Sequence, residues 1–341
     1  MAKKEYTFED ICRDIDNKNF APVYILMGEE PYFIDKIEEL LVKNVLNETE
    51  RDFNQMIFYG SDSDVVNIIN TARRFPMMSE RQLVIVKEAQ NLSKIDMLSH
   101  YVKTPASSTV LVICHKYKKL DGRKSLLMEA KKVGVVYESK KIFDNKMPGF
   151  IISYMKQQLM DIDGKSAQML TDYLGNDLSR LEKEAEKLSV ILGNSVTKRI
   201  TPEIIEKNIG ISKDFNNFEF VNAIASKDIL RVNRIADYFD KNQKLNPVQM
   251  VLPAVFNYFV NLMICFYSKD RSERGVMQTL NLQWPFQTAD YMLGLRNYNA
   301  MKVFDAIREI RTADAKSKGF GATSSSNAGD IYKELLYKII H

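Results

Sequence analysis

The feature that most constrains the fold is the regular alternation of short apolar runs with amphipathic stretches over the first 145 residues. The runs are rich in Val and Ile and occupy residues 22–27, 55–59, 82–86, 109–114 and 135–138. Segments of helical character lie between them, at residues 32–45, 64–73, 94–102 and 123–132. This alternation predicts βαβ units and a parallel sheet covered on both faces. An antiparallel α+β domain fits less well, because no tight hairpin signals join the runs.

Beyond residues 140–149 nearly the whole sequence has a helical period. In residues 178–192 the apolar side chains fall three or four apart and share one face, and Gly193 is placed to end that helix. A polar stretch at residues 210–218 separates two helical blocks, and a small-residue loop at 316–330 precedes a last helix. We therefore expect an α/β domain at residues 1–143, a small helical domain at 144–211 and a second helical domain at 212–341.

Charge and composition limit the classes of function. The 48 basic and 44 acidic residues leave a net charge of only +4, which is less than domains dedicated to DNA usually carry. The three cysteines, Cys12, Cys114 and Cys265, are far apart and lie in or beside apolar runs. They indicate free thiols in a reducing compartment and not a disulfide or zinc framework.

The most apolar window, residues 247–267, is about long enough to cross a bilayer. Polar residues interrupt it, and Pro253 lies inside it, with Pro247 expected to open the helix and Asn246 to cap it. We predict a buried helix of a cytoplasmic protein with no membrane association. The start of the chain turns acidic where the apolar part of a secretory leader would begin.

The first apolar run ends at a glycine turn that resembles a phosphate-binding turn in position only. Gly28 is followed by Glu29, Glu30 and Pro31, whereas a P-loop needs a second glycine, a lysine and a Ser or Thr for phosphate and Mg²⁺. The two carboxylates would repel a triphosphate but suit a helix N-terminus. Lys87 directly follows the third run, where a magnesium-binding acid would stand. The sequence predicts a degenerate nucleotide site without ATP hydrolysis, metal or cofactor.

Six motifs in register carry a resemblance to a known family. They are "PVYILMGEEPYFIDK", "RRFPMMSERQLVIVKEA", "YKKLDGRKSL", "LGNDLSRLEKEAEKL", "ITPEIIEKNIGISKDFNNFEFVNAI" and "IREIRTADAKSKGFG…IYKELLYKII". In this order they resemble the delta subunit of the bacterial DNA polymerase III clamp loader, over nearly the whole chain. The resemblance implies a RecA-like AAA+ domain, then a helical lid domain, then a helical domain that packs into a pentameric collar.

The resemblance also implies a function without intrinsic catalysis. A delta subunit binds the beta sliding clamp and opens the ring for loading onto primed DNA, while delta-prime and gamma/tau-type subunits complete the heteropentamer and sister subunits hydrolyse ATP. The family places two adjacent hydrophobic residues before the third strand, and here they fall on Met77 and Met78, with Phe75 and Pro76 beside them. Such a pair at an exposed tip suits a partner's pocket. The alternative is that both methionines are buried in their own domain.

Basic residues and two other functions stay open at this point. Lys118, Lys119, Arg123 and Lys124 are candidate contacts for DNA phosphates, although solvated surface charge explains such clusters more often. Other basic residues that raise the same question are Lys116, Lys140, Lys141, Lys316 and Lys318. An active P-loop NTPase and a stand-alone nucleic-acid-binding protein are the competing functions. The glycine turn disfavours the first, and the low net charge disfavours the second.

Overall fold

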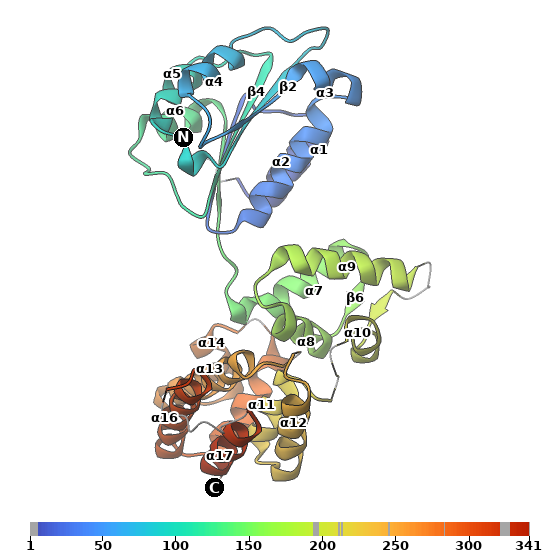
Figure 1. The fold of residues 1–341 in the computed structure, drawn as a ribbon, viewed down its shortest axis with the longest axis vertical. Helices are drawn as coiled ribbons and strands as arrows, with labels where there is room; N and C mark the ends of the chain where they lie inside the picture. Colours follow the sequence, from blue (N-terminus) through green and yellow to red (C-terminus); the bar gives the residue numbers. More distant parts are fainter. Residues whose placement is uncertain are drawn as a thin grey trace. The chain divides into compact units, whose positions relative to one another are not determined.

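The computed structural model describes residues 6–193, 198–210, 212, 214–244, 246–282, 284–320 and 328–340, without the side chain of Asp144. It consists of two compact units, Met1–Ile142 and Phe143–His341 (Figure 1). The first unit is α/β and the second is built mainly from helices, so the expected fold class is confirmed. The division of the second unit into separate domains at residues 144–211 and 212–341 stays a prediction.

The first unit contains a five-stranded, wholly parallel sheet with strand order β2-β3-β4-β1-β5. The strands are β1 (Val23–Gly28), β2 (Gln55–Tyr59), β3 (Gln82–Lys87), β4 (Thr109–Lys116) and β5 (Val135–Ser139). All five runs predicted from the sequence form strands, and their ends differ from the predicted ones by at most two residues. The central strands β1, β3 and β4 are buried on both faces, which explains why their sequences read as continuous apolar runs.

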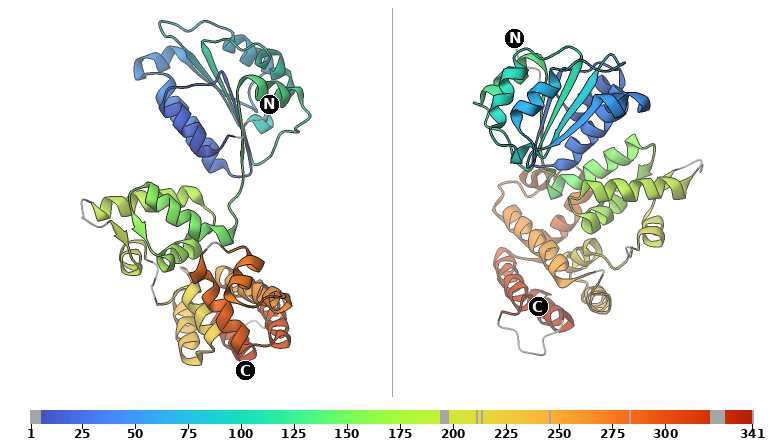
Figure 2. Two further views of the ribbon diagram at one scale, coloured as in Figure 1. Left: turned by 180° about the vertical axis from the view of Figure 1, so that it is seen from behind. Right: turned by 45° about the horizontal axis from the view of Figure 1, so that its top comes forward.

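Helices cover both faces of this sheet, as Figure 2 shows from two further directions. One face packs on α1 (Phe8–Asp16) and α2 (Pro31–Val45). The other packs on α4 (Val65–Ala72), α5 (Ser99–Val102) and α6 (Ser125–Val133), with 3₁₀ turns η1 (Ala89–Asn91) and η2 (Ile95–Leu98). Successive residues of β1 alternate between the two faces of the sheet. Val23 and Ile25 lie in the core beside α4, α5 and α6, and Tyr24 and Leu26 lie in the core beside α1 and α2.

Two helices of this unit are missing from the predicted set, namely α1 and α3 (Glu48–Asn54). Both begin with a capping box, formed by Thr7 with Asp10 and by Asn47 with Glu50. In each box the N-cap side chain accepts from the N3 backbone, and the N3 side chain accepts from the N-cap backbone. The local signal for both helices was therefore present in the sequence.

The second unit begins with η3 (Asp144–Lys146) and four helices joined by a small strand pair. These helices are α7 (Met147–Gln157), α8 (Gly164–Leu174), α9 (Leu178–Leu192) and α10 (Pro202–Ile209). Helix α9 forms where the apolar spacing predicted a helix, and as expected it ends before Gly193, which has φ +50°. The sequence predicted only helices in this region, but β6 (Asp161–Ile162) and β7 (Arg199–Ile200) form a short parallel strand pair.

Most of the remaining helices share one hydrophobic core, while α14 (Glu273–Leu280) packs in a smaller cluster with Cys265. These remaining helices are α11 (Asn217–Ser226), α12 (Ile229–Lys241), α13 (Val248–Tyr267), α14, η4 (Pro285–Thr288), α15 (Ala289–Asn297), α16 (Ala300–Ser317) and α17 (Ala328–Ile340). The predicted loop at residues 316–330 is only partly observed, because residues 321–327 lie outside the described residues.

Helix α13 is the apolar helix that the sequence predicted to be buried. By length and composition it is, among the described residues, the one helix able to cross a membrane. Its buried face, which includes Val255, Phe259 and Leu262, lies in the core shared with α11, α12, α16 and α17. The expected start was wrong in detail, because Pro247 is the N-cap residue and no side chain caps the helix. Pro253 is accommodated within the helix.

Candidate functional site

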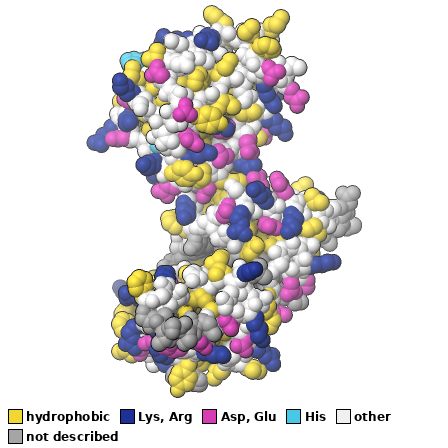
Figure 3. Space-filling model, viewed as in Figure 1, with side chains coloured by type: hydrophobic (Ala, Val, Ile, Leu, Met, Phe, Trp, Pro, Cys, Tyr) yellow, Lys and Arg dark blue, Asp and Glu magenta, His cyan; other side chains and the backbone are white. Residues whose placement is uncertain are grey.

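The segment that joins α4 to β3, residues 73–81, carries large apolar side chains into solvent. Phe75 is 89% exposed, Met77 62% and Met78 103%, while Pro76 is half-buried. The alternative that both methionines are buried in their own domain is therefore wrong. Figure 3 shows hydrophobic side chains protruding at the end of the α/β unit drawn at the top. We call residues 75–78 the apolar loop.

The backbone of the apolar loop is held by a side chain from α3. Asn54 is buried, and its Oδ1 accepts a hydrogen bond from the N–H of Met77 at 2.7 Å. Its Nδ2 donates to the carbonyl of Met77 at 2.9 Å and to the carbonyl of Glu50 at 3.1 Å. One amide side chain thus satisfies both backbone groups of Met77, which leaves the methionine side chain free to point outward.

A second amide secures the start of the loop. Gln82, the buried first residue of β3, donates through Nε2 to the carbonyls of Arg74 at 2.6 Å and Thr71 at 3.2 Å. The same nitrogen lies 2.8 Å from the hydroxyl of Thr109, which itself donates to the carbonyl of Ala72. The end of α4 and the loop that follows are therefore fixed to the sheet.

Met78 lies at the tip of the loop in a left-handed backbone conformation, with φ +51°. A side chain with a Cβ costs about 1–2 kcal/mol in this region. Full exposure of a methionine also forgoes the stabilisation that burial would give, on the order of 2 kcal/mol. Both features reduce stability, so packing within the α/β unit does not account for the position of Met78.

The glycine turn after β1 is closed by its own neighbours. Gly28 has φ +136°, and a Cβ there would lie 2.0 Å from the carbonyl oxygen of Ser139. The N–H of Glu29 donates to that carbonyl at 3.0 Å, and the hydroxyl of Ser139 donates to the carbonyl of Glu30 at 2.6 Å. The Glu30 carboxylate then caps α2 by accepting from the N–H of Tyr32 at 3.1 Å. A carboxylate thus occupies the N-terminus of α2, the kind of position that also attracts phosphate groups in proteins.

Lys87 lies at the end of β3 and forms an ion pair with Glu38 of α2, with 2.8 Å between Nζ and Oε1. The hydrogen bond with Glu38 raises the pKa of Lys87 above its usual value. The Cys114 thiol donates to the other oxygen of Glu38 at 3.6 Å, and burial raises the pKa of this thiol well above its ordinary range. The structure therefore fills this edge of the sheet with an internal ion pair and an un-ionised thiol.

Some of the basic residues at and after the end of β4 form ion pairs with acidic neighbours. Lys119 pairs with Glu138 at 2.6 Å, and Arg123 pairs with Asp121 at 3.0 Å. Lys118 is exposed, and its carbonyl accepts a hydrogen bond from Nδ1 of His115, while Lys124 precedes α6. Lys116 pairs with Asp35 at 2.5 Å. These pairs reduce the net positive charge that a phosphate backbone would meet.

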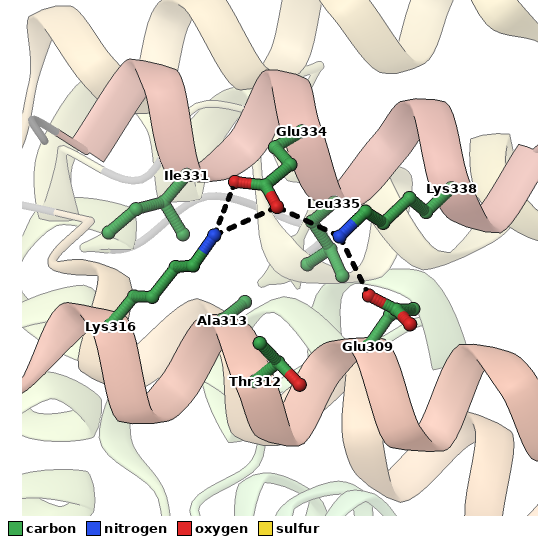
Figure 4. A pocket seen from close by; sticks show the side chains of 8 residues that line it. All are labelled: Glu309, Thr312, Ala313, Lys316, Ile331, Glu334, Leu335 and Lys338. Atoms are coloured by element: carbon green, nitrogen blue, oxygen red, sulfur yellow. Dashed lines mark hydrogen bonds and ion pairs between the residues drawn. The ribbon is translucent and has the colours of Figure 1, made fainter. Parts of the chain in front are cut away.

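Lys316 and Lys318 are paired in the same way, on the surface of α16. Figure 4 shows the shallow pocket between α16 and α17, where Lys316 contacts Glu334 at 2.6 Å and Lys338 bridges Glu334 and Glu309. The two lysines lower the pKa of Glu334 to about 2. Lys318 pairs with Asp314 at 2.7 Å. This network joins the two helices and leaves little unbalanced charge.

Comparison with known proteins relates the chain to one family. Residues 24–140 match the family described as "DNA polymerase III, delta subunit". A curated relative, DNA polymerase III subunit delta of Bacillus subtilis (strain 168), is 26% identical over 322 residues, or 91% of each chain. The chain is similar to the DNA polymerase III delta subunit. The resemblance expected from the sequence is thereby confirmed.

A solved structure agrees with the delta-subunit fold along the whole chain. The Bacillus subtilis DNA clamp loader delta protein aligns with a TM-score of 0.59 at 22% identity, covering 98% of this chain and 99% of that one. The delta-family match at residues 24–140 includes the glycine turn, Asn54 and the apolar loop. The α/β unit and the helical unit are therefore arranged along the chain as in a delta subunit.

Asn54 and Gln82 are the functional candidates that the sequence did not reveal. Each acts through a side-chain amide that forms hydrogen bonds with backbone groups 8 to 23 residues away in the chain. No local sequence pattern predicts such a contact. The capping box at the start of α3 could have located that helix and placed Asn54 at its end. Within the described residues, no three His, Cys, Asp or Glu side chains lie together where they could share a metal ion.

Proposed function

We propose that this chain binds the beta sliding clamp through the apolar loop and opens the ring, as the delta subunit of a DNA polymerase III clamp loader. The observation that carries the proposal is the exposure of Phe75, Met77 and Met78 on a backbone that Asn54 and Gln82 hold in place. Adjacent apolar side chains on a fixed, protruding loop suit a hydrophobic pocket of a partner. Methionine adapts well to an irregular pocket because its thioether is flexible.

Opening the clamp needs binding energy and no chemistry. A protein that binds the open ring more tightly than the closed ring shifts the equilibrium by the difference between the two affinities. Moving a two-state equilibrium from rare to predominant takes about 5.5 kcal/mol. A few buried anchor residues can supply several kcal/mol of binding free energy, so a loop of this size is sufficient as the main contact.

We further propose that the chain hydrolyses no ATP and depends on other loader subunits for it. Glu30 occupies the helix N-terminus at the glycine turn, and the Lys87–Glu38 pair stands at the strand end where Mg²⁺ would be ligated. Delta-prime and gamma/tau-type subunits are the expected neighbours in the cytoplasm, and primed DNA is the expected substrate of the whole complex. Nucleotide titration with Mg²⁺ tests this part, because saturable micromolar ATP binding would favour an active P-loop NTPase.

Capture of a purified bacterial sliding clamp tests the main proposal. The full chain is compared with the variant Met77→Ala/Met78→Asn, in which asparagine tolerates the left-handed backbone of residue 78. A matched control is Met97→Ala/Met128→Asn, which removes two exposed methionines elsewhere in the same unit. We expect the loop variant to lose capture and the control to keep it. Equal capture by all three proteins would refute the role of the loop.

A further inference from the structure

We propose that Asn54 is a positioning residue that orders the apolar loop before the partner arrives. The inference rests on the proposed function and adds a residue that touches no partner itself. Asn54 is only 2% exposed, so it acts through Met77 and not by direct contact. Its role is to lower the entropic cost of clamp binding by fixing the loop in advance.

The geometry of the Asn54 contact resembles the pairing of two strand residues. Its Oδ1 accepts from the Met77 N–H at 2.7 Å, and its Nδ2 donates to the Met77 carbonyl at 2.9 Å. The third bond, from Nδ2 to the Glu50 carbonyl at 3.1 Å, fixes the amide itself against α3. The side chain therefore has one orientation, and it holds both polar groups of the Met77 backbone.

Only Phe75 and Pro76 lie between this contact and the one made by Gln82. Gln82 holds the Arg74 carbonyl at 2.6 Å, and the ring of Pro76 restricts its own φ. Ordering a residue's backbone costs about 1–2 kcal/mol, which a mobile loop would have to lose on binding. The two amides thus leave the apolar loop few conformations to lose.

Ordering of the apolar loop by itself adds little to the stability of the folded chain. Phe75, Met77 and Met78 are all exposed, so fixing their backbone adds almost no apolar contact to either core of the α/β unit. Two of the three hydrogen bonds of one buried amide are therefore made with a segment that does not pack. Such order is useful when a partner covers the exposed side chains.

The test measures the affinity of the full chain for a purified bacterial sliding clamp by surface plasmon resonance. Asn54→Ala is compared with Asn44→Ala, a control in the same unit whose Nδ2 donates to the Leu40 carbonyl at 2.9 Å. We expect Asn54→Ala to weaken affinity about tenfold, equivalent to about 1.4 kcal/mol. The control should stay within about twofold of the native protein, which corresponds to roughly 0.4 kcal/mol.

The same substitution made in the loop variant separates a positioning role of Asn54 from a general loss of fold stability. If Asn54 acts through the loop, Asn54→Ala added to Met77→Ala/Met78→Asn should change the residual affinity less than about twofold, because coupled residues are not additive. Trypsin should also cut faster after Arg74 in Asn54→Ala than in the native protein, while the melting transition remains cooperative. An equal loss in both backgrounds would mean that Asn54 supports the fold in general, and it would overturn the inference.

The outcomes also distinguish this inference from the proposed function. If the loop variant loses affinity and Asn54→Ala does not, Asn54 has no positioning role and the proposed function stands. If neither variant loses affinity, the proposed function fails and the inference fails with it. Should Asn54→Ala not fold, Asn54→Asp is judged by the same criteria, because it keeps the acceptor for the Met77 N–H and loses the donor to the Met77 carbonyl.

Discussion

Lys87 and Glu38 form an ion pair with 2.8 Å between Nζ and Oε1, at the edge of the sheet where β1 ends in the glycine turn. The side chain of Glu38 is 9% exposed and that of Lys87 is 34% exposed. Lys87 therefore supplies a positive charge from within the chain to a carboxylate that is buried in the α/β unit. The pair allows an acidic residue to be buried in α2 without a ligand.

Removal of Lys87 should destabilise the α/β unit. In Lys87→Met, Glu38 remains buried without a cation, and we expect the free energy of unfolding to fall by about 1–3 kcal/mol, below the range for fully buried pairs because Lys87 is partly exposed. The double variant Lys87→Met/Glu38→Gln should recover part of this loss. Urea unfolding of the three proteins measures it, and equal stability of Lys87→Met and native protein would contradict the prediction.

Replacement of Met78 by asparagine should stabilise the chain. Asparagine adopts φ near +51° more readily than methionine, so we expect a gain of about 0.5–1 kcal/mol in the free energy of unfolding. The control Met128→Asn, at an exposed position within α6, should lose stability because asparagine is a poorer helix former. Opposite signs for the two substitutions, measured by denaturant unfolding, are the expected result; a loss at both positions would show that residue 78 is unstrained.

Gly28 should tolerate no side chain. A Cβ would lie 2.0 Å from the Ser139 carbonyl oxygen and 2.7 Å from its nitrogen, and both are backbone atoms that cannot rotate away. We expect Gly28→Ala to cost more than about 3 kcal/mol, because strain at φ +136° adds to the clash. Gly122→Ala is a suitable control, since no atom lies within 4 Å of the Cβ position there. Thermal unfolding compares the two, and a small effect at residue 28 would mean that β5 can move aside.

Asp172 should make the helical unit less stable as the pH rises. Burial raises the pKa of its carboxyl from 3.8 to about 7, while its hydrogen bond from Gln168 opposes this shift. Because the folded state holds the proton more tightly than the unfolded state, stability is highest at acidic pH and decreases between about pH 4 and 7.

The variant Asp172→Asn tests whether the charge on Asp172 causes this loss of stability with rising pH. Asparagine stays neutral, so the variant should lose less stability than the native protein between pH 5 and 8, by on the order of 2 kcal/mol. Thermal melts across that range provide the measurement, with Asp161→Asn as the control at an exposed position. Parallel pH profiles for native protein and Asp172→Asn would show that Asp172 ionises normally.

The sequence predicts the sheet well because its central strands β1, β3 and β4 are buried on both faces and therefore read as uninterrupted apolar runs. The helix α9 was equally clear, since its buried residues Leu178, Leu181, Ala185 and Leu188 repeat at helical spacing. Short helices are harder to predict from the sequence. Helix α3 has only seven residues and one buried side chain, Asn54, so it has no apolar stripe to detect.

The apolar loop could be located from the sequence, but its support could not. Exposure of Met77 and Met78 follows from their position in a polar segment between α4 and β3. The bonds from Asn54 and Gln82 depend on which strands are neighbours in the sheet, and this is a property of the tertiary structure. The pairing of Lys119 with Glu138 and of Arg123 with Asp121 likewise offsets part of the positive charge of the basic cluster, which a count of lysines and arginines does not reveal.

Ser139 links the glycine turn to the exit of the chain from the α/β unit. It is the last residue of β5, its carbonyl accepts from Glu29, and its hydroxyl donates to the Glu30 carbonyl. The unit ends only three residues later, at Ile142. The chain therefore leaves the α/β unit from a strand end that is hydrogen-bonded to the glycine turn. Any flexibility of the connection to the second unit must lie after Ser139.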